Sequence, residues 1–197
     1  MSEVRAHKKE LRARHLRARR GLTTEELRAG QAALAERADD LPSAAARGTV
    51  AAYVSTGTEP GTRDLIDRLR ESGTRVLLPV LLPDNDLDWA EYGGRADLER
   101  TSRGLLEPTG PRLGPLAVTQ ARTVLLPGLA VDSRGVRLGR GGGSYDRVLA
   151  RLEAAETRPA LVVVLYGHEV VEAVPREPHD HLVDAAMTPD GVRRFLR

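Results

Sequence analysis

The sequence predicts an α/β fold: a single three-layer domain over residues 1–197, with a mainly parallel central sheet and helices on both faces. Short apolar runs rich in Val and Leu alternate with segments that repeat apolar residues at helical spacing. Strands joined by helices favour right-handed crossovers, which produce parallel strands covered on both faces. The length of 197 residues suits one domain of ordinary size and leaves little room for two.

Helices are expected in five segments. The basic N-terminal segment is polar and helix-forming. The next segment opens with a capping box, in which Thr23 and Glu26 supply hydrogen-bond partners for the first turn, and it ends before Pro42. Helical spacing, capping residues or a closing glycine indicate the others. The expected helices are residues 1–22, 23–41, 62–73, 144–156 and a short capped helix at 188–196.

Strands are also expected in five segments. Residues 49–55 (TVAAYVS) form a continuous apolar, β-branched run of the kind that lies buried in a parallel sheet. Residues 74–82, 123–132 and 160–167 have the same character, and residues 87–92 (LDWAEY) indicate a further strand.

The absence of cysteine narrows the chemistry. A chain without Cys has no disulfide framework, no thiolate zinc site and no cysteine nucleophile, and it suits the cytosol. The N-terminal residues lack an apolar core of signal-peptide length, and nowhere do 18 apolar residues run together. We therefore expect a cytoplasmic protein with no membrane partner. We also expect a monomer whose partners are small molecules and not nucleic acid.

Positive charge is concentrated at the N-terminus. Residues 1–20 contain eight Lys and Arg but two Glu, whereas the rest of the chain is mildly acidic. A solvated helix face, a nucleic-acid arm and a polyphosphate-binding helix all fit this pattern. Lys8 and Lys9 are the only lysines in the chain, which favours a specific use of the compact ammonium charge.

Four glycines stand among arginines in the segment RLGRGGGSYDR, Arg137 to Arg147. The segment follows a predicted strand and leads into a predicted helix, where an open parallel sheet places a ligand crevice and helix N–H groups bind anions. A tight turn with a helix cap, Ser144 being the cap, is the simpler alternative. No lysine follows the glycines, so the segment is not a Walker loop, and Asp146 replaces the second glycine of a nucleophile elbow.

Motifs along nearly the whole chain match one family in order. They are KKELR at 8–12, YVSTGTE at 53–59, LLEP at 105–108, LLPGLAVDSRGVRLGRGGGSYDR at 125–147 and YGHEVVEAVPREPHDHLVDAAMTPDG at 166–191. The sequence thereby resembles the 5-formyltetrahydrofolate cyclo-ligase family, also called methenyltetrahydrofolate synthetase. The glycine segment and the C-terminal segment are the most specific parts of the match.

The resemblance implies an enzyme that closes 5-formyltetrahydrofolate to 5,10-methenyltetrahydrofolate, with ATP as co-substrate and Mg²⁺ as cofactor, and releases ADP and phosphate. It also implies the residues of the site. ATP-binding residues would be Lys8, Arg12, Arg137, Gly139, Gly141, Gly142 and Gly143. Substrate-binding residues would be Val54, Glu59, Arg140, Gly141, Gly142, Gly143 and Ser144. Arg140 and Tyr145 would be catalytic, and Asp146 and Asp184 would bind the metal.

Several of these residues have simpler interpretations. Lys8 and Arg12 could be exposed residues of a basic helix without a further role, and Glu59 could be a solvated turn residue. Asp146 could stabilise a helix N-terminus through the dipole, and Asp184 could be a surface carboxylate.

The chain also departs from the family pattern at two positions. Ser144 stands where the family often has a first tyrosine, and Arg103 stands where many members have an aromatic residue. Arg103 could instead pair with the glutamate tail of the folate. We expect structural roles, rather than metal binding, for His168, His179 and Asp180.

Two other functions remain open from the sequence. A sugar-phosphate isomerase or CoA-transferase-like enzyme could share the scaffold without the chemistry. Nucleic-acid binding through the basic N-terminus is the second alternative, although few aromatic side chains accompany the basic residues.

Overall fold

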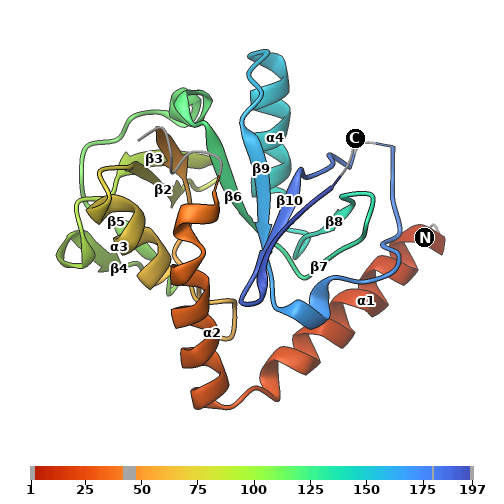
Figure 1. The fold of residues 1–197 in the computed structure, drawn as a ribbon. Helices are drawn as coiled ribbons and strands as arrows, with labels where there is room; N and C mark the ends of the chain where they lie inside the picture. Colours follow the sequence, from red (N-terminus) through yellow and green to blue (C-terminus); the bar gives the residue numbers. More distant parts are fainter. Residues whose placement is uncertain (1–2, 42–47, 179, 196–197) are drawn as a thin grey trace.

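A seven-stranded sheet forms the centre of the molecule (Figure 1), in a computed structural model that describes residues 3–41, 48–178 and 180–195. The strand order is β11-β10-β9-β6-β1-β2-β3. The five inner strands run parallel, and β3 and β11 pair antiparallel at the two edges. The predicted α/β class with a mainly parallel sheet is therefore confirmed.

The strands β1, β2, β3, β6 and β9 begin within one residue of the predicted apolar runs, but several of them end earlier. The sheet contains β1 (Thr49–Ala51), β2 (Arg75–Leu81), β3 (Leu87–Glu91), β6 (Thr123–Pro127), β9 (Ala160–Val164), β10 (Ala185–Thr188) and β11 (Gly191–Arg194). Two separate hairpins complete the strands: β4 (Leu98–Arg100) with β5 (Leu106–Pro108), and β7 (Ala130–Val131) with β8 (Arg137–Leu138).

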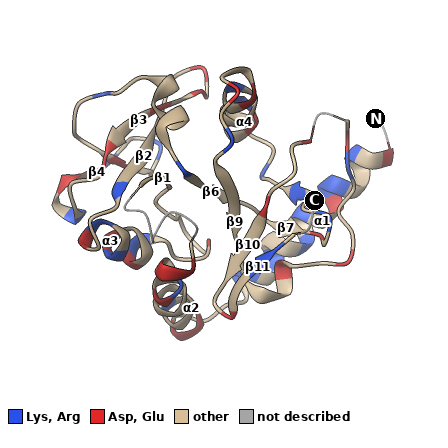
Figure 2. Ribbon diagram, turned by 45° about the horizontal axis from the view of Figure 1, so that its top comes forward, with Lys and Arg blue, Asp and Glu red and all other residues tan. Residues whose placement is uncertain are grey.

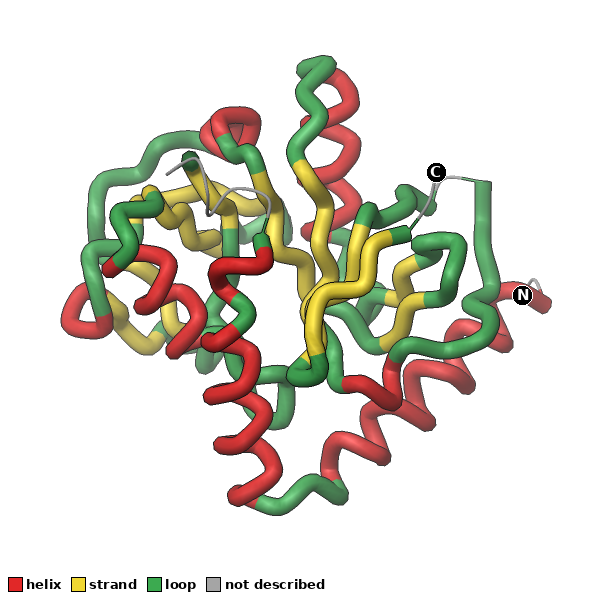
Figure 3. Tube along the Cα trace, viewed as in Figure 1, coloured by secondary structure: helices red, strands yellow, loops and turns green. Residues whose placement is uncertain are grey.

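Helices cover both faces of the sheet, as alternation along the strands requires. Val50 packs in a core cluster with residues of α2 (Thr24–Glu36) and α3 (Arg63–Glu71). Its neighbour Ala51 points to the opposite cluster, which contains residues of α4 (Ser144–Ala154) and of the 3₁₀ helix η4 (Pro115–Gln120). The three-layer arrangement results from these two cores (Figure 3).

The N-terminal helix α1 (Glu3–Arg20) packs away from the central sheet. Its Leu11 and Leu16 contact a third small core, formed by the β7–β8 hairpin and Val174. Figure 1 shows α1 lying beside this hairpin. None of the described helices is long and apolar enough to cross a membrane.

Three expectations need correction. The strand expected at 49–55 ends at Ala51, and the strand expected at 123–132 breaks at Gly128 into β6 and β7. The C-terminal helix expected at 188–196 is wrong: residues 188–194 end β10, turn, and return as β11. Pairing with β10 satisfies the backbone of this segment, and Gly191 allows the turn with a φ of +143°. Tertiary pairing thus overrides the local capping signal.

Candidate functional site

A cavity of about 300 Å³ opens at the carboxyl ends of the parallel strands. Val54 beyond β1, Pro79 and Leu81 in β2, and Pro127 at the end of β6 contribute to its wall. This edge of an open α/β sheet is where such folds bind ligands. The cavity also contains most residues that the family resemblance implied: Val54, Glu59, Arg137, Gly139, Arg140, Gly141, Gly142, Gly143, Ser144, Tyr145 and Asp146.

The glycine segment joins β8 to α4 and forms one wall of this pocket. Gly141 and Gly143 have φ of +91° and +80°, a region that side chains disfavour. No atom lies within 4 Å of the Cβ position at Gly142 or Gly143, so the backbone is open on that side. Gly143 is the N-cap of α4 and offers no side-chain cap, which corrects the expected capping role of Ser144. The first N–H groups of α4 can therefore bind an anion.

Arg137 is a nearly buried cation beside this loop. Its side chain is 7% exposed; Nη1 donates to the Pro127 carbonyl at 2.9 Å and Nη2 to Asp146 at 3.2 Å. Burial lowers the pKa of Arg137, which the negative charge of Asp146 opposes. Its Nε is buried and has no partner among the described residues. The guanidinium therefore places a buried positive charge at the pocket wall, beside the glycine segment.

Glu59 lies inside the pocket, with only 10% of its side chain exposed. Its Oε2 accepts hydrogen bonds from the backbone N–H and hydroxyl of Thr56, at 2.8 and 3.2 Å. Its Oε1 lies 3.5 Å from Nε of Arg140, whose side chain is half exposed. The solvated alternative for Glu59 is therefore wrong, and one carboxylate oxygen faces a cation that a ligand can displace.

Two tyrosines give the pocket an aromatic lining. Tyr145 was expected from the motif, whereas Tyr53 was missed, although its strand-end position before Val54 was a usable signal. Burial raises the pKa of both phenols well above the usual value, and the nearby charge of Glu59 adds to this effect. Both side chains are neutral at physiological pH and suit a flat, uncharged ring system.

Apolar residues that sequence reasoning missed line the rest of the pocket. They come from β2, β3 and β5 and their flanks: Pro79, Leu81, Leu87, Leu105 and Leu106. Glu107 also lines the pocket, and its Oε1 accepts a hydrogen bond from the Leu81 amide at 3.0 Å. The motif LLEP could have pointed to these three residues, Leu105 to Glu107, because it was part of the family resemblance. No role in the site had been assigned to it.

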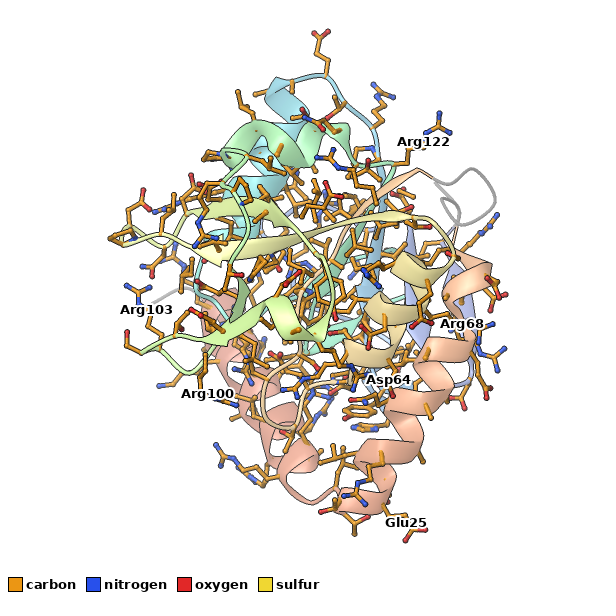
Figure 4. The ribbon with its side chains drawn as sticks, turned by 90° about the vertical axis from the view of Figure 1, so that its left-hand side faces the viewer. Glu25, Asp64, Arg68, Arg100, Arg103 and Arg122 are labelled. Carbon is orange, nitrogen blue, oxygen red and sulfur yellow. The ribbon has the colours of Figure 1, made fainter. Side chains whose placement is uncertain are left out.

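Arg103 lies outside the pocket lining, on the turn between β4 and β5. Its guanidinium is 3.4 Å from the side-chain oxygen of Asn85. Figure 4 shows Arg100 and Arg103 projecting outward on the same side of the molecule.

Basic side chains of α1 approach residues 139–143, which we call the glycine loop, from outside the pocket. Figure 2 shows the concentration of Lys and Arg along this helix. Arg12 donates from Nε to the Gly139 carbonyl at 2.8 Å, and its guanidinium lies 3.5 Å from the Cβ position of Gly141. Arg12 therefore braces the loop directly.

Lys8 is not the exposed residue that the sequence suggested, because its side chain is only 7% exposed. Its Nζ lies 3.0 Å from Glu177 and 2.6 Å from Asp180. The hydrogen bond from Lys8 lowers the pKa of Glu177. Neither Lys8 nor Arg12 lines the pocket itself, although the charge of Asp180 is near enough to Arg137 to oppose the lowering of its pKa by burial.

The two expected metal ligands are not brought together. Asp146 is exposed at the start of α4 and lines the pocket. Asp184 precedes β10, where its Oδ2 accepts a hydrogen bond from the Leu161 amide at the start of β9. It lines a separate hollow with Leu152, near the far end of α4. Because Asp146 and Asp184 lie toward opposite ends of the parallel strands, the structure does not form a site shared by both.

One group of potential metal ligands occurs elsewhere among the described residues: His15, His168 and Glu169, whose ligand atoms lie within 4.8 Å of one another. Both oxygens of Glu169 already accept hydrogen bonds from Arg19, at 2.6 and 2.8 Å. The guanidinium charge opposes a second cation at this carboxylate. The rings of His15 and His168 stack instead, which agrees with the expected structural role of His168. His179 lies outside the described residues.

Comparison with known proteins identifies the family. The family model described as "5-formyltetrahydrofolate cyclo-ligase family" matches residues 4–189. A 5-formyltetrahydrofolate cyclo-ligase of Mycolicibacterium smegmatis is 42% identical over 146 residues, which cover 72% of this chain and 73% of that protein. The enzyme of the same name from Escherichia coli is 33% identical over 178 residues, covering 88% of this chain and 96% of that protein.

Solved structures agree with the sequence relatives. The 5,10-methenyltetrahydrofolate synthetase of Aquifex aeolicus superposes with a TM-score of 0.80 at 29% identity, covering 96% of this chain and 93% of that one. The synthetase of Mycoplasma pneumoniae, at 19% identity and a TM-score of 0.71, shares the fold and covers 92% of this chain and 98% of that one. Family model, relatives and fold all agree, and the chain belongs to the 5-formyltetrahydrofolate cyclo-ligase family.

Proposed function

We propose that this protein converts 5-formyltetrahydrofolate and ATP to 5,10-methenyltetrahydrofolate, ADP and phosphate. The observation that carries the proposal is the position of the glycine loop. One side of the loop lines an apolar pocket that contains Glu59 and two tyrosines, and Arg12 of α1 braces the loop through the Gly139 carbonyl. A loop placed in this way can bring a polyphosphate and a flat heterocycle into contact.

The chemical problem is that an N-formyl group is a poor electrophile, because its oxygen does not leave. In the proposed reaction the formyl oxygen attacks the γ-phosphorus of ATP and ADP departs. The neighbouring folate nitrogen then attacks the formyl carbon and releases its proton to solvent, the carbon–oxygen bond breaks, and phosphate leaves with that oxygen. The protein must align the reactants and balance the migrating charge, and no covalent intermediate with the protein is needed.

We assign the folate to the pocket. The pterin would lie against Tyr53 and Tyr145, and Glu59 would accept hydrogen bonds from its N–H groups. Arg140, which is 3.5 Å from Glu59, would exchange this partner for the formyl oxygen or the phosphoryl group. Val54 would contact the apolar edge of the ring.

We assign the phosphates of ATP to the glycine loop and its cations. The N–H groups of residues 141–144 offer donors for phosphate oxygens, and the guanidinium of Arg137 adds positive charge beside them. Arg12 holds the loop, and Lys8 would reach the phosphates only if it exchanged one of its two carboxylate partners. The backbone donors and Arg137 are therefore the primary phosphate ligands in this proposal.

Asp146 fits a magnesium ion, because a pocket-lining carboxylate with exposed oxygens is the hard ligand that Mg²⁺ prefers. Magnesium, when bound, would neutralise phosphate charge during transfer. Phosphate oxygens and water would supply the remaining ligands, since Asp184 lies elsewhere.

The other functions considered from the sequence receive no support from the comparisons, which name cyclo-ligases and methenyltetrahydrofolate synthetases. Lys8, Arg12 and Arg19 of the basic helix are engaged within the chain, which favours a small-molecule function over a nucleic-acid arm. We also propose that residues 1–197 work as one domain, because the residues assigned to both substrates meet at one pocket, and that the protein is a monomer.

A coupled assay tests the proposal. With 5-formyltetrahydrofolate, ATP and magnesium, near-ultraviolet absorbance of the conjugated methenyl product should rise in step with ADP, one ADP per product. Omission of ATP, or chelation of magnesium, should abolish both signals. ADP formation without absorbance change, or no signal from demonstrably folded protein, would defeat the proposal.

A further inference from the structure

A buried ion pair links α1 to the body of the protein behind the pocket. The side chains of Arg19 and Glu169 are 1% and 0% exposed. Nε of Arg19 donates to Oε1 of Glu169 at 2.6 Å, and Nη2 donates to Oε2 at 2.8 Å. The geometry is bidentate, the strongest and most directional form of this interaction. Neither residue lines the pocket.

The first connection from the pair to the pocket runs through Gly128. Nη2 of Arg19 also donates to the Gly128 carbonyl at 2.7 Å. Gly128 lies in the turn that ends β6, and it lines the pocket. A Cβ at this position would lie 2.6 Å from Val163, so the turn has little freedom to move toward the sheet. Arg19 thus fixes the pocket wall from behind.

The second connection runs through Tyr166 to Glu59. The Tyr166 amide donates to Oε2 of Glu169 at 3.0 Å, and the Tyr166 hydroxyl donates to the Thr58 carbonyl at 3.4 Å. Thr58 precedes Glu59 in the same turn, and the carboxylate of Glu59 enters the pocket. The guanidinium of Arg19 lies 5.8 Å from the Tyr166 ring centroid, and His168 stacks on that ring at 5.9 Å.

Electrostatics place the pair near the same residues. Burial opposes the charge of Arg19, but the hydrogen bond and charge of Glu169 raise its pKa, with further contributions from Tyr53 and Glu59. Both of the latter line the pocket. Arg19 is therefore held charged close to the candidate folate site.

A buried ion pair contributes little net stability, because an apolar pair of similar size often stabilises a protein to the same extent. What an apolar pair cannot supply is the directed bond to Gly128 and the acceptor for Tyr166. We propose that Arg19 and Glu169 are positioning residues that set the affinity of the pocket for the folate. This inference rests on the proposed function for the identity of the ligand.

The contacts of the pair predict which substrate it affects. They lead to Gly128 and, through Tyr166 and Thr58, to the turn of Glu59, which we assign to the folate. None of the described contacts of the pair reaches residues 141–144, which we assign to the phosphates. Loss of the pair should therefore weaken folate binding much more than ATP binding.

The test compares Arg19→Met, Arg19→Lys and the double variant Arg19→Met with Glu169→Leu, with Arg17→Met on the exposed side of α1 as control. Chemical denaturation gives the stability of each variant. Calorimetric titration with 5-formyltetrahydrofolate in the absence of ATP gives the folate Kd, and steady-state kinetics give KM for both substrates. Wild-type protein that binds the folate but does not turn over would contradict the proposed function and leave this inference testable by binding.

We expect Arg19→Met to lower the denaturation midpoint, since it leaves Glu169 buried without its partner. The double variant should regain much of that midpoint, while its folate Kd and KM stay raised about tenfold and its KM for ATP stays within about twofold of wild type. Arg19→Lys, which keeps the charge but not the fork, should show the same split. Wild-type folate affinity in the double variant or in Arg19→Lys would overturn the proposal. So would an equal rise for both substrates.

Discussion

Glu59 is the residue on which folate recognition depends in this account. It is a mostly buried carboxylate held by Thr56, with a second oxygen near Arg140. Glu59→Gln keeps the size but replaces one acceptor oxygen with a donor. Because a hydrogen bond to a charged group contributes about 1.5–3 kcal/mol, KM for 5-formyltetrahydrofolate should rise about 10- to 100-fold.

Steady-state kinetics at saturating ATP measure this change, with Glu71→Gln at the exposed end of α3 as a matched control. An unchanged folate KM in Glu59→Gln would show that the pterin does not use this carboxylate.

Asp146 is the candidate metal ligand, and Asp184 is its natural control because the structure places it outside the pocket. Asp146→Asn should raise the magnesium concentration for half-maximal activity by about tenfold, equivalent to about 1.4 kcal/mol. Asp184→Asn should leave that concentration unchanged. A magnesium titration of activity measures both.

The competing role for Asp146 is stabilisation of the α4 N-terminus. In that case Asp146→Asn would lower the free energy of unfolding by about 0.3–1 kcal/mol at unchanged magnesium requirement. That result would remove Asp146 from the metal site.

At the scale of elements, helix α1 carries a residue that makes its docking sensitive to pH. His15 is buried, and its Nε2 has no partner among the described residues. Burial lowers the pKa of His15 to about 4, and the charges of Arg14, His168 and Arg19 contribute. The neutral form is favoured in the folded state, so the contribution to stability is complete above pH 6.5 and is lost as pH falls toward 4.

The free energy of unfolding should therefore decrease across this window by up to about 1.4 kcal/mol per pH unit from His15 alone. His15→Leu should flatten the decrease, whereas His7→Leu on the exposed side of the same helix should not. Denaturant titrations between pH 7 and pH 4.5 measure it. If the free energy of unfolding changed with pH in the same way for wild type and His15→Leu, protonation of His15 would not destabilise the folded state.

The elements also show where sequence patterns succeed. The capping box of Thr23 and Glu26 begins α2 as predicted, with both reciprocal hydrogen bonds formed. Continuous apolar runs give β2, β6 and β9, because burial on both faces leaves a strong local signal. The β10–β11 hairpin was missed because its turn residues also resemble a helix start. In addition, β10 joins the sheet by pairing with β9, which is distant in the sequence, so the local pattern does not reveal it.

At the scale of the whole molecule, the motifs supplied much of the site before any coordinates. The glycine loop, Glu59 and Tyr145 meet in one pocket as the resemblance implied. Tyr53 and the leucines of the opposite wall were missed, because apolar lining residues look like core residues in a sequence. Lys8 was expected to be exposed, and its burial depends on Glu177 and Asp180, about 170 residues away in the chain.

The central claim is that the pocket and the glycine loop bring the formyl oxygen to the γ-phosphate of ATP. A single-turnover reaction with substrate labelled with oxygen-18 in the formyl group tests this most directly. We expect the label to leave the folate and appear in inorganic phosphate, with one labelled oxygen per methenyl product. Unlabelled phosphate formed together with the methenyl product, with the label released to water, would contradict phosphorylation of the formyl oxygen.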